Sequence, residues 1–189
     1  MATVDISTTT GVHALPIPRM IALVIGALVV ALGAQVAIPL ATTPIPVTLQ
    51  VPAVLLVGGL LGPRLGAASL VLYLTMGAAG LPVFAPMGAP GIARLFGPTG
   101  GYLLAYPLAA ALTGLIAADG RSWVRLASAV VVGLVVIHAG GVAQLAALGG
   151  DVAGAVKIGS VPFLLNDLPK LAVAALLIRK FAAQTEALR

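Results

Sequence analysis

Long runs of this chain carry almost no charged side chains, and this feature constrains the fold more than any other. Only 8% of its 189 residues are charged, and 60% are hydrophobic. Charged residues make up about a quarter of a typical soluble domain. Five acidic and ten basic residues cannot give so apolar a chain a polar surface. We therefore expect an integral membrane protein whose main solvent is the lipid bilayer.

The apolar runs have the lengths of membrane-spanning helices, which need about 20 mostly apolar residues. Four of them cover residues 20–38, 103–118, 123–148 and 161–181. Two shorter runs end near residues 61 and 80 and meet at Gly62-Pro63-Arg64, which favours a tight turn. The sequence thus predicts an all-α membrane domain of six transmembrane helices over residues 16–189. Residues 1–15 are polar and small, and we expect them to form a flexible cytoplasmic tail.

The basic residues follow the positive-inside rule if both termini are cytoplasmic. The bases expected inside are Arg19, Arg64, Arg121, Arg125, Arg179, Lys180 and Arg189, and those expected outside are Arg94, Lys157 and Lys170. Because the bases stand singly, a nucleic-acid partner is not expected. The chain has no cysteine, so it has no disulfide and no thiolate metal site.

A stretch rich in proline and glycine, "GLPVFAPMGAPGIARLFGPTGGY", separates the predicted third and fourth helices. An outer loop of this length is typical of a lid or a binding loop. It contains Arg94, whose guanidinium suits a carboxylate. The alternative is that Arg94 only anchors the chain at the membrane interface.

The stretch "NDLPK" places an acid and a base at the mouth of the last apolar run. We expect Pro169 in the first helical turn, with Asn166 or Asp167 as its cap. Asp167 and Lys170 would then share one helix face and hold a polar ligand head group between them. The alternative is that they only pair with each other.

Other polar residues in the spans have structural as well as functional interpretations. Gln50 needs a hydrogen-bond partner inside the membrane, and helix-to-helix bonding would satisfy it. His138 is more often a packed hydrogen bonder than a proton relay. Ala27 and Ala31 stand four residues apart in the first span, a pattern typical of helix packing in the bundle or of docking on a partner. No protease, hydrolase or nucleotide-binding motif is present, so we expect no catalytic residues, no metal and no cofactor.

Several segments together resemble the BioY family, the biotin-specific substrate-binding (S) components of energy-coupling factor (ECF) transporters. They are "PVTLQ", "LLGPRLG", "GLPVFA", "GPTGGYLLAYPLA" and "PFLLNDLPKLAVAAL", within residues 32–177. The resemblance implies a six-helix protein of the bacterial cytoplasmic membrane with a biotin pocket near the outer surface. It also implies a transmembrane coupling protein and two ATPase subunits as partners. Whether the chain transports alone, as a homo-oligomer or only with these partners stays open.

The resemblance also implies roles for residues. Asp167 and Lys170 would contact the ureido ring of biotin, and Arg94 its valerate carboxylate. Ala27 and Ala31 would dock on the coupling protein. The candidate substrate-binding set is Asp167, Lys170, Arg94, Asn166, Tyr102, Phe84 and Gln50. The alternatives are a component for another vitamin such as thiamine or riboflavin, a small membrane-embedded enzyme, or a purely structural subunit.

Overall fold

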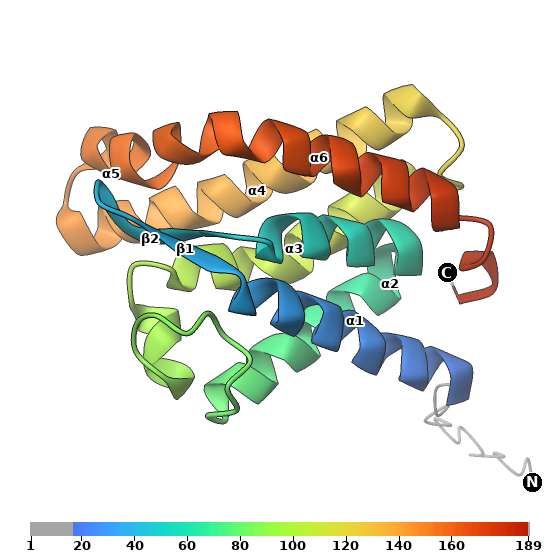
Figure 1. Ribbon diagram of the computed structural model, residues 1–189, viewed down its shortest axis with the longest axis horizontal. Helices are drawn as coiled ribbons and strands as arrows, with labels where there is room; N and C mark the ends of the chain where they lie inside the picture. The colour runs from blue at the N-terminus through green and yellow to red at the C-terminus, as the bar shows by residue number, and fades with distance from the viewer. Residues whose placement is uncertain (1–16, 189) are drawn as a thin grey trace, which may run out of the picture.

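The computed structural model describes residues 17–188, and most of these residues lie in helices that run side by side (Figure 1). Among these residues, five helical segments are long and apolar enough to cross a membrane. The elements are α1 (Ile17–Gln35), β1 (Ala37–Leu40), β2 (Thr43–Thr48), α2 (Gln50–Ala78), η1 (Gly91–Phe96), α3 (Gly100–Ala117), α4 (Trp123–Gly149), α5 (Val152–Gly159), α6 (Val161–Phe181) and η2 (Glu186–Leu188). The tail predicted at residues 1–15 lies outside the described residues.

Helix α2 is folded back on itself at Gly62, where the backbone leaves the helical conformation. Gly62 has φ 79° and ψ 178°, which glycine adopts without strain. Within α2, Nε2 of Gln50 donates a 2.7 Å hydrogen bond to the hydroxyl of Tyr73. In a straight helix these residues would lie about 35 Å apart. The turn predicted at Gly62-Pro63-Arg64 is therefore present, and the two short predicted spans correspond to the two halves of α2.

Small residues let α2, α3 and α4 approach closely at the centre of the molecule. A Cβ atom on Gly58 of α2 would overlap the backbone of Ala110 in α3. A Cβ atom on Gly114 of α3 would lie 2.5 Å from the carbonyl oxygen of Gly58. Thr113 is fully buried there, and its hydroxyl donates to the carbonyl of Ala129 in α4. These contacts fix the three helices as one rigid frame.

Residues 37–48 form an antiparallel hairpin, which corrects the all-α prediction. The sequence pattern predicted no strand, and prolines are frequent in this segment. A two-stranded ribbon has a free edge on each strand, so prolines can sit where no ladder bond is needed. The side chains of β2 alternate: Thr43 and Ile45 are buried, and Pro44 between them is exposed. The hairpin therefore turns one face toward the helices.

The last helix starts earlier than the sequence pattern predicted. We expected Pro169 in its first turn, but α6 begins at Val161, with Pro162 in the first turn and Pro169 inside the helix. Neither Asn166 nor Asp167 is its cap; the residue at that position is Ser160. The unpredicted helix α5 leads directly into this start. As a result, Asp167 lies well inside α6 and not at its end.

The connecting segments are divided between the two ends of the helical bundle (Figure 1). The first and last described residues, the Gly62 turn and the α3–α4 connection lie at one end. The β1–β2 hairpin, residues 79–99 with η1, and α5 gather at the other end. We call the second one the loop-rich end.

Candidate ligand-binding site

A cavity lies at the loop-rich end, and together with the open space at its mouth it has a volume of about 620 Å³. The hairpin, residues 79–99 and helices α2, α3, α4 and α6 all contribute to its walls. The lining residues are Ile45, Pro46, Thr48, Gln50, Val51, Phe84, Ala85, Arg94, Thr99, Tyr102, Leu103, Tyr106, Ile137, His138, Phe163, Asp167 and Lys170.

One end of the cavity holds His138, Asp167 and Lys170, which we call the Asp167 cluster. The side chain of Asp167 is only 2% exposed. Its Oδ1 accepts from Nζ of Lys170 at 3.0 Å, and its Oδ2 lies 3.1 Å from Nε2 of His138. Lys170 and Asp167 come from α6, and His138 comes from α4. A carboxylate buried in a membrane helix is thus compensated by two donors.

Asp167 and Lys170 pair directly in this structure, and their role in holding a ligand head group stays a prediction. Pairing does not exhaust their hydrogen-bonding capacity. A carboxylate has about four lone-pair sites, and an ammonium has three N–H donors. Each partner can therefore bind a ligand while the pair stays intact.

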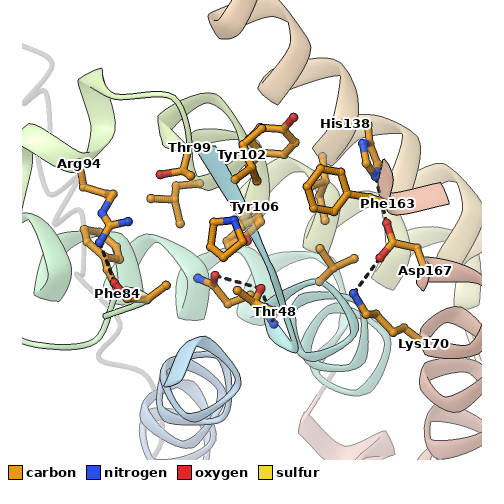
Figure 2. Close-up of a pocket in the computed structure, with 17 residues that line it drawn as sticks. Thr48, Phe84, Arg94, Thr99, Tyr102, Tyr106, His138, Phe163, Asp167 and Lys170 are labelled. Carbon is orange, nitrogen blue, oxygen red and sulfur yellow. Dashed lines mark hydrogen bonds and ion pairs between the residues drawn. The ribbon is translucent and has the colours of Figure 1, made fainter. Parts of the chain in front are cut away.

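The other end of the cavity holds Arg94, which η1 places opposite the Asp167 cluster (Figure 2). Arg94 is only 6% exposed. Its Nε donates to the carbonyl of Ala89 at 2.9 Å, and one terminal nitrogen donates to that of Ala85 at 2.6 Å. Among residues 17–188, no carboxylate forms an ion pair with it. Arg94 is therefore a buried cation without an anionic partner in the described chain.

The charge of Arg94 survives its burial. Burial lowers the pKa of the guanidinium, and the nearby Tyr73 acts in the opposite direction. An arginine guanidinium is not deprotonated in proteins, so the group keeps its positive charge. Gly88 makes room for it, because a Cβ there would lie 2.7 Å from Nη1 of Arg94. With φ at 101°, position 88 also favours glycine on conformational grounds.

Aromatic rings form the walls between the two polar ends. The predicted residues Phe84 and Tyr102 both line the cavity. Phe84 packs edge-on against Tyr73, with ring centroids 5.5 Å apart. The Tyr102 hydroxyl donates to the carbonyl of Gly159 at 2.6 Å. Gly141 leaves space for the Tyr102 ring, which a Cβ at that position would overlap.

Gln50 belongs both to the cavity wall and to a buried hydrogen-bond chain. Its amide donates to Tyr73, and its Oε1 accepts from the Thr48 hydroxyl at 3.2 Å. The helix-to-helix bonding considered from the sequence is therefore present between the halves of α2. Gln50 also lines the cavity, and its contact with a substrate stays a prediction.

Three predicted residues lie outside the cavity. Asn166 is exposed, and its amide donates to the carbonyl of Pro162 one turn earlier. Ala27 and Ala31 are 0% and 8% exposed, on the face of α1 that packs against α2. Both alanines are packed within the bundle here, and docking on a coupling protein stays a prediction.

His138 is the main site residue that sequence reasoning underestimated. Its partners Ser160 and Asp167 lie 22 and 29 residues away, so no local pattern links them. Tyr106 and Phe163 were also not singled out, although both are buried in the cavity wall. The one signal available was a histidine in an otherwise apolar run.

The site is a slot with a cation at one end, a satisfied ion pair at the other and aromatic walls between. It suits a small, partly apolar ligand with an anionic tail and a head group that both donates and accepts hydrogen bonds. The sequence model of the BioY family matches residues 7–187, which is nearly the whole chain. The chain belongs to the BioY family.

Curated relatives agree with this membership. The chain is 41% identical over 153 residues to a "Probable biotin transporter BioY" from Pyrococcus horikoshii, covering 81% of this chain and 89% of that protein. It is 40% identical over 148 residues to a "Biotin transporter BioY" from Thermotoga maritima, covering 78% and 86%. A third relative, from Rhizobium etli, is 33% identical over 162 residues.

The fold also matches a solved structure. The 2.1 Å crystal structure of the S-component for biotin from an ECF-type ABC transporter superposes with a TM-score of 0.81. The match covers 92% of this chain and 98% of that one, at 23% identity. This likeness shows that the BioY chain has the S-component fold.

Proposed function

We propose that this chain binds biotin and mediates its uptake across the cytoplasmic membrane. It does so as a transport component and not as an enzyme, in keeping with the transporter names of its relatives. The observation that carries the proposal is the layout of the cavity in a BioY-family chain. A lone buried arginine faces the Asp167 cluster across an aromatic slot. Biotin has a matching layout, with a carboxylate tail, a sulfur-containing ring and a ureido head.

The Asp167 cluster would hold the ureido head. The ureido N–H groups need acceptors, and both oxygens of Asp167 keep a free lone pair. The ureido oxygen needs a donor, and Lys170 keeps two N–H groups beyond its bond to Asp167. The head group then adds to the existing pair without breaking it.

Arg94 would bind the valerate carboxylate. A guanidinium presents five N–H donors, of which the structure assigns two to the backbone of its own segment. A carboxylate would neutralise a charge that has no partner in the described chain. Phe84, Tyr102 and Phe163 would pack on the ring and the valeryl chain.

The same arginine argues against thiamine, which carries a positive charge. A cation in this slot would meet an unpaired guanidinium in a medium of low dielectric constant. Riboflavin has no carboxylate for Arg94, so it would leave the guanidinium uncompensated. Biotin satisfies both ends of the cavity.

We place the protein in the membrane with six spans, counting the two halves of α2 separately, and with both termini cytoplasmic. The bases Arg64, Arg121 and Arg179 then lie on the cytoplasmic side, in keeping with the positive-inside rule. The cavity opens outward, toward the biotin supply. A transmembrane coupling protein and two ATPase subunits would supply the energy, because the sequence has no nucleotide-binding motif of its own.

Equilibrium binding of radiolabelled biotin to the purified chain in detergent tests the proposal. The parent should bind biotin saturably, and an excess of thiamine or riboflavin should not displace it. Asp167→Asn and Lys170→Ala should each weaken binding about tenfold or more, because each removes a charged hydrogen-bond partner. Asp119→Asn, at the opposite end, should bind like the parent. Unchanged binding by both cavity variants would refute the assignment.

A further inference from the structure

The His138 side chain links helix α4 to helix α6 and to the junction between α5 and α6. It projects from α4, its Nε2 lies 3.1 Å from Oδ2 of Asp167 in α6, and its Nδ1 lies 3.0 Å from the hydroxyl of Ser160. Ser160 is the residue between α5 and α6. His138 is therefore hydrogen-bonded through both ring nitrogens. Its partners are Ser160, just before α6 begins, and Asp167, about two helical turns further along the chain.

The two bonds fix where the proton of a neutral His138 lies. A carboxylate only accepts hydrogen bonds, so Nε2 must carry the hydrogen that faces Asp167. Nδ1 is then an acceptor, and the Ser160 hydroxyl can donate to it. A hydrogen bond to the second ring nitrogen, here from Ser160 to Nδ1, sets both the tautomer and the ring orientation of a histidine.

Two aromatic rings also hold the imidazole in place. The ring of Tyr102 stands edge-on to it, with centroids 6.1 Å apart and an interplanar angle of 82°. The ring of Phe163 lies 6.3 Å away on α6. The His138 side chain is only 12% exposed, so little solvent competes for its hydrogen bonds. Both the packing and the hydrogen bonds favour one fixed orientation.

We propose that His138 is a positioning residue that aims the Asp167 carboxylate at the ligand head group, with Ser160 holding the tautomer that does so. Asp167 Oδ1 is bound by Lys170, a flexible side chain on the same helix. His138 supplies the one bond to Asp167 from another helix among the described residues. The bond from α4 therefore fixes the rotation of the carboxylate, which Lys170 alone would leave free. This inference rests on the proposed biotin site.

A measurement that needs no ligand tests the hydrogen-bond arrangement. The chain has two histidines, so His13→Asn leaves His138 as the one histidine for nitrogen-15 NMR. At a pH where the imidazole is neutral, we expect the spectrum of the Nε2–H tautomer. Asp167→Asn should shift this spectrum toward a mixture of tautomers. A predominant Nδ1–H tautomer in the parent, or the averaged signal of a free imidazole, would overturn the inference.

Biotin binding tests the positioning role. His138→Leu removes the donor and should weaken binding about tenfold or more. His138→Gln can still reach Asp167 with an amide N–H and should recover most of the loss. The decisive variant is His138→Leu combined with Asp167→Asn. If His138 acts through Asp167, the second substitution adds less than about threefold, whereas independent effects would multiply.

The outcomes separate this inference from the proposed function. If the parent binds biotin and His138→Leu binds as well, the positioning role is wrong and the proposed function stands. If the parent does not bind biotin, the proposed function fails, and the NMR spectrum decides the arrangement by itself. Gel filtration and thermal unfolding identify a variant that fails to fold. In that case Ser160→Ala, which leaves the histidine in place, should give a smaller loss of affinity in the same direction, and no loss would count against the inference.

Discussion

At the residue scale, the charge of Arg94 gives the strongest argument for a ligand that carries an anionic group. Burying an ion without a partner costs several kcal/mol even after the protein relaxes around it. The carbonyls of Ala85 and Ala89 offset part of this cost, because they accept two of its hydrogen bonds. A ligand carboxylate would offset the rest. In the proposed site, the anionic end of the ligand would therefore be selected by electrostatics as well as by shape.

Arg94→Gln should discriminate between ligands with and without a carboxylate. Biotin should bind about tenfold to a hundredfold more weakly, because a charge-assisted pair is lost. Biotin amide, which has no carboxylate, should bind the variant and the parent almost equally. Competition against radiolabelled biotin measures both affinities.

The matched control for this experiment is Arg125→Gln, since Arg125 is an exposed arginine at the N-terminal start of α4. It should bind both ligands like the parent. If Arg94→Gln weakened the binding of biotin and of biotin amide by the same factor, the arginine would stabilise the loop and would not bind the ligand carboxylate.

The sequence predicted the charged residues of the site better than the neutral ones. Asp167, Lys170 and Arg94 could be found because a charge in an apolar chain needs a reason to be there. His138 and Tyr106 could not be assigned in the same way, since their partners are brought close only by folding. Asn166 was wrongly placed because a helix start at Pro169 was expected.

At the scale of elements, two glutamines fix the segment that carries Arg94. The amide of Gln144 on α4 donates to the carbonyls of Leu95 and Gly97, at 2.9 and 2.7 Å. The amide of Gln35, at the end of α1, reaches the carbonyls of Pro82 and Phe84. Residues 79–99 are thus held to two helices by side chains that pair with their backbone.

Gln144→Ala should loosen the Arg94 segment and weaken biotin binding about threefold to tenfold, because two hydrogen bonds to the loop are lost. The effect should appear mainly as faster dissociation, which a chase with unlabelled biotin measures. Gln184→Ala, at an exposed position after α6, should dissociate like the parent. An unchanged dissociation rate in Gln144→Ala would show that the loop needs no anchor on α4.

Gly58→Ala should destabilise the helical frame. The added Cβ would overlap the backbone of Ala110, and a backbone cannot move aside as a flexible side chain can. We expect a loss of about 1–3 kcal/mol in the free energy of unfolding, seen as a lower melting temperature in detergent. Gly149→Ala is the control, because its Cβ would meet nothing within 4 Å. Equal melting temperatures for both variants would contradict the close approach of α2 and α3.

The elements that sequence patterns missed are those defined by long-range contacts. The spans of α3 and α4 were predicted to within a few residues, since apolar length defines them. The apolar run 161–181 also matches α6, whereas the start expected near Pro169 from the proline and its possible caps was wrong. The β1–β2 hairpin was missed because its prolines indicate a loop, and its pairing shows only in the folded chain. Helix α5 is short, and its apolar residues merge with the following run.

At the scale of the whole molecule, the connections and the charges agree on an orientation. The loop-rich end holds the cavity, and the opposite end holds the described termini (Figure 1). Arg121, Arg179 and Lys180 lie at the end with the termini. The positive-inside rule then favours the outward-facing cavity that we propose.

Cysteine labelling tests this orientation, and the chain suits it because it has no cysteine of its own. Lys157 on α5 and Glu186 in η2 are both exposed and lie at opposite ends. In intact cells, a membrane-impermeant maleimide should label Lys157→Cys and leave Glu186→Cys unlabelled until the membrane is opened. The reverse labelling pattern would invert the proposed topology.

The most direct test of the two-ended site is an experimental structure of the chain with biotin bound. We expect the ureido ring within hydrogen-bond distance of Asp167 and Lys170, the carboxylate at Arg94, and the bond between Asp167 and His138 intact. Biotin in the opposite orientation, or bound outside this cavity, would contradict the account.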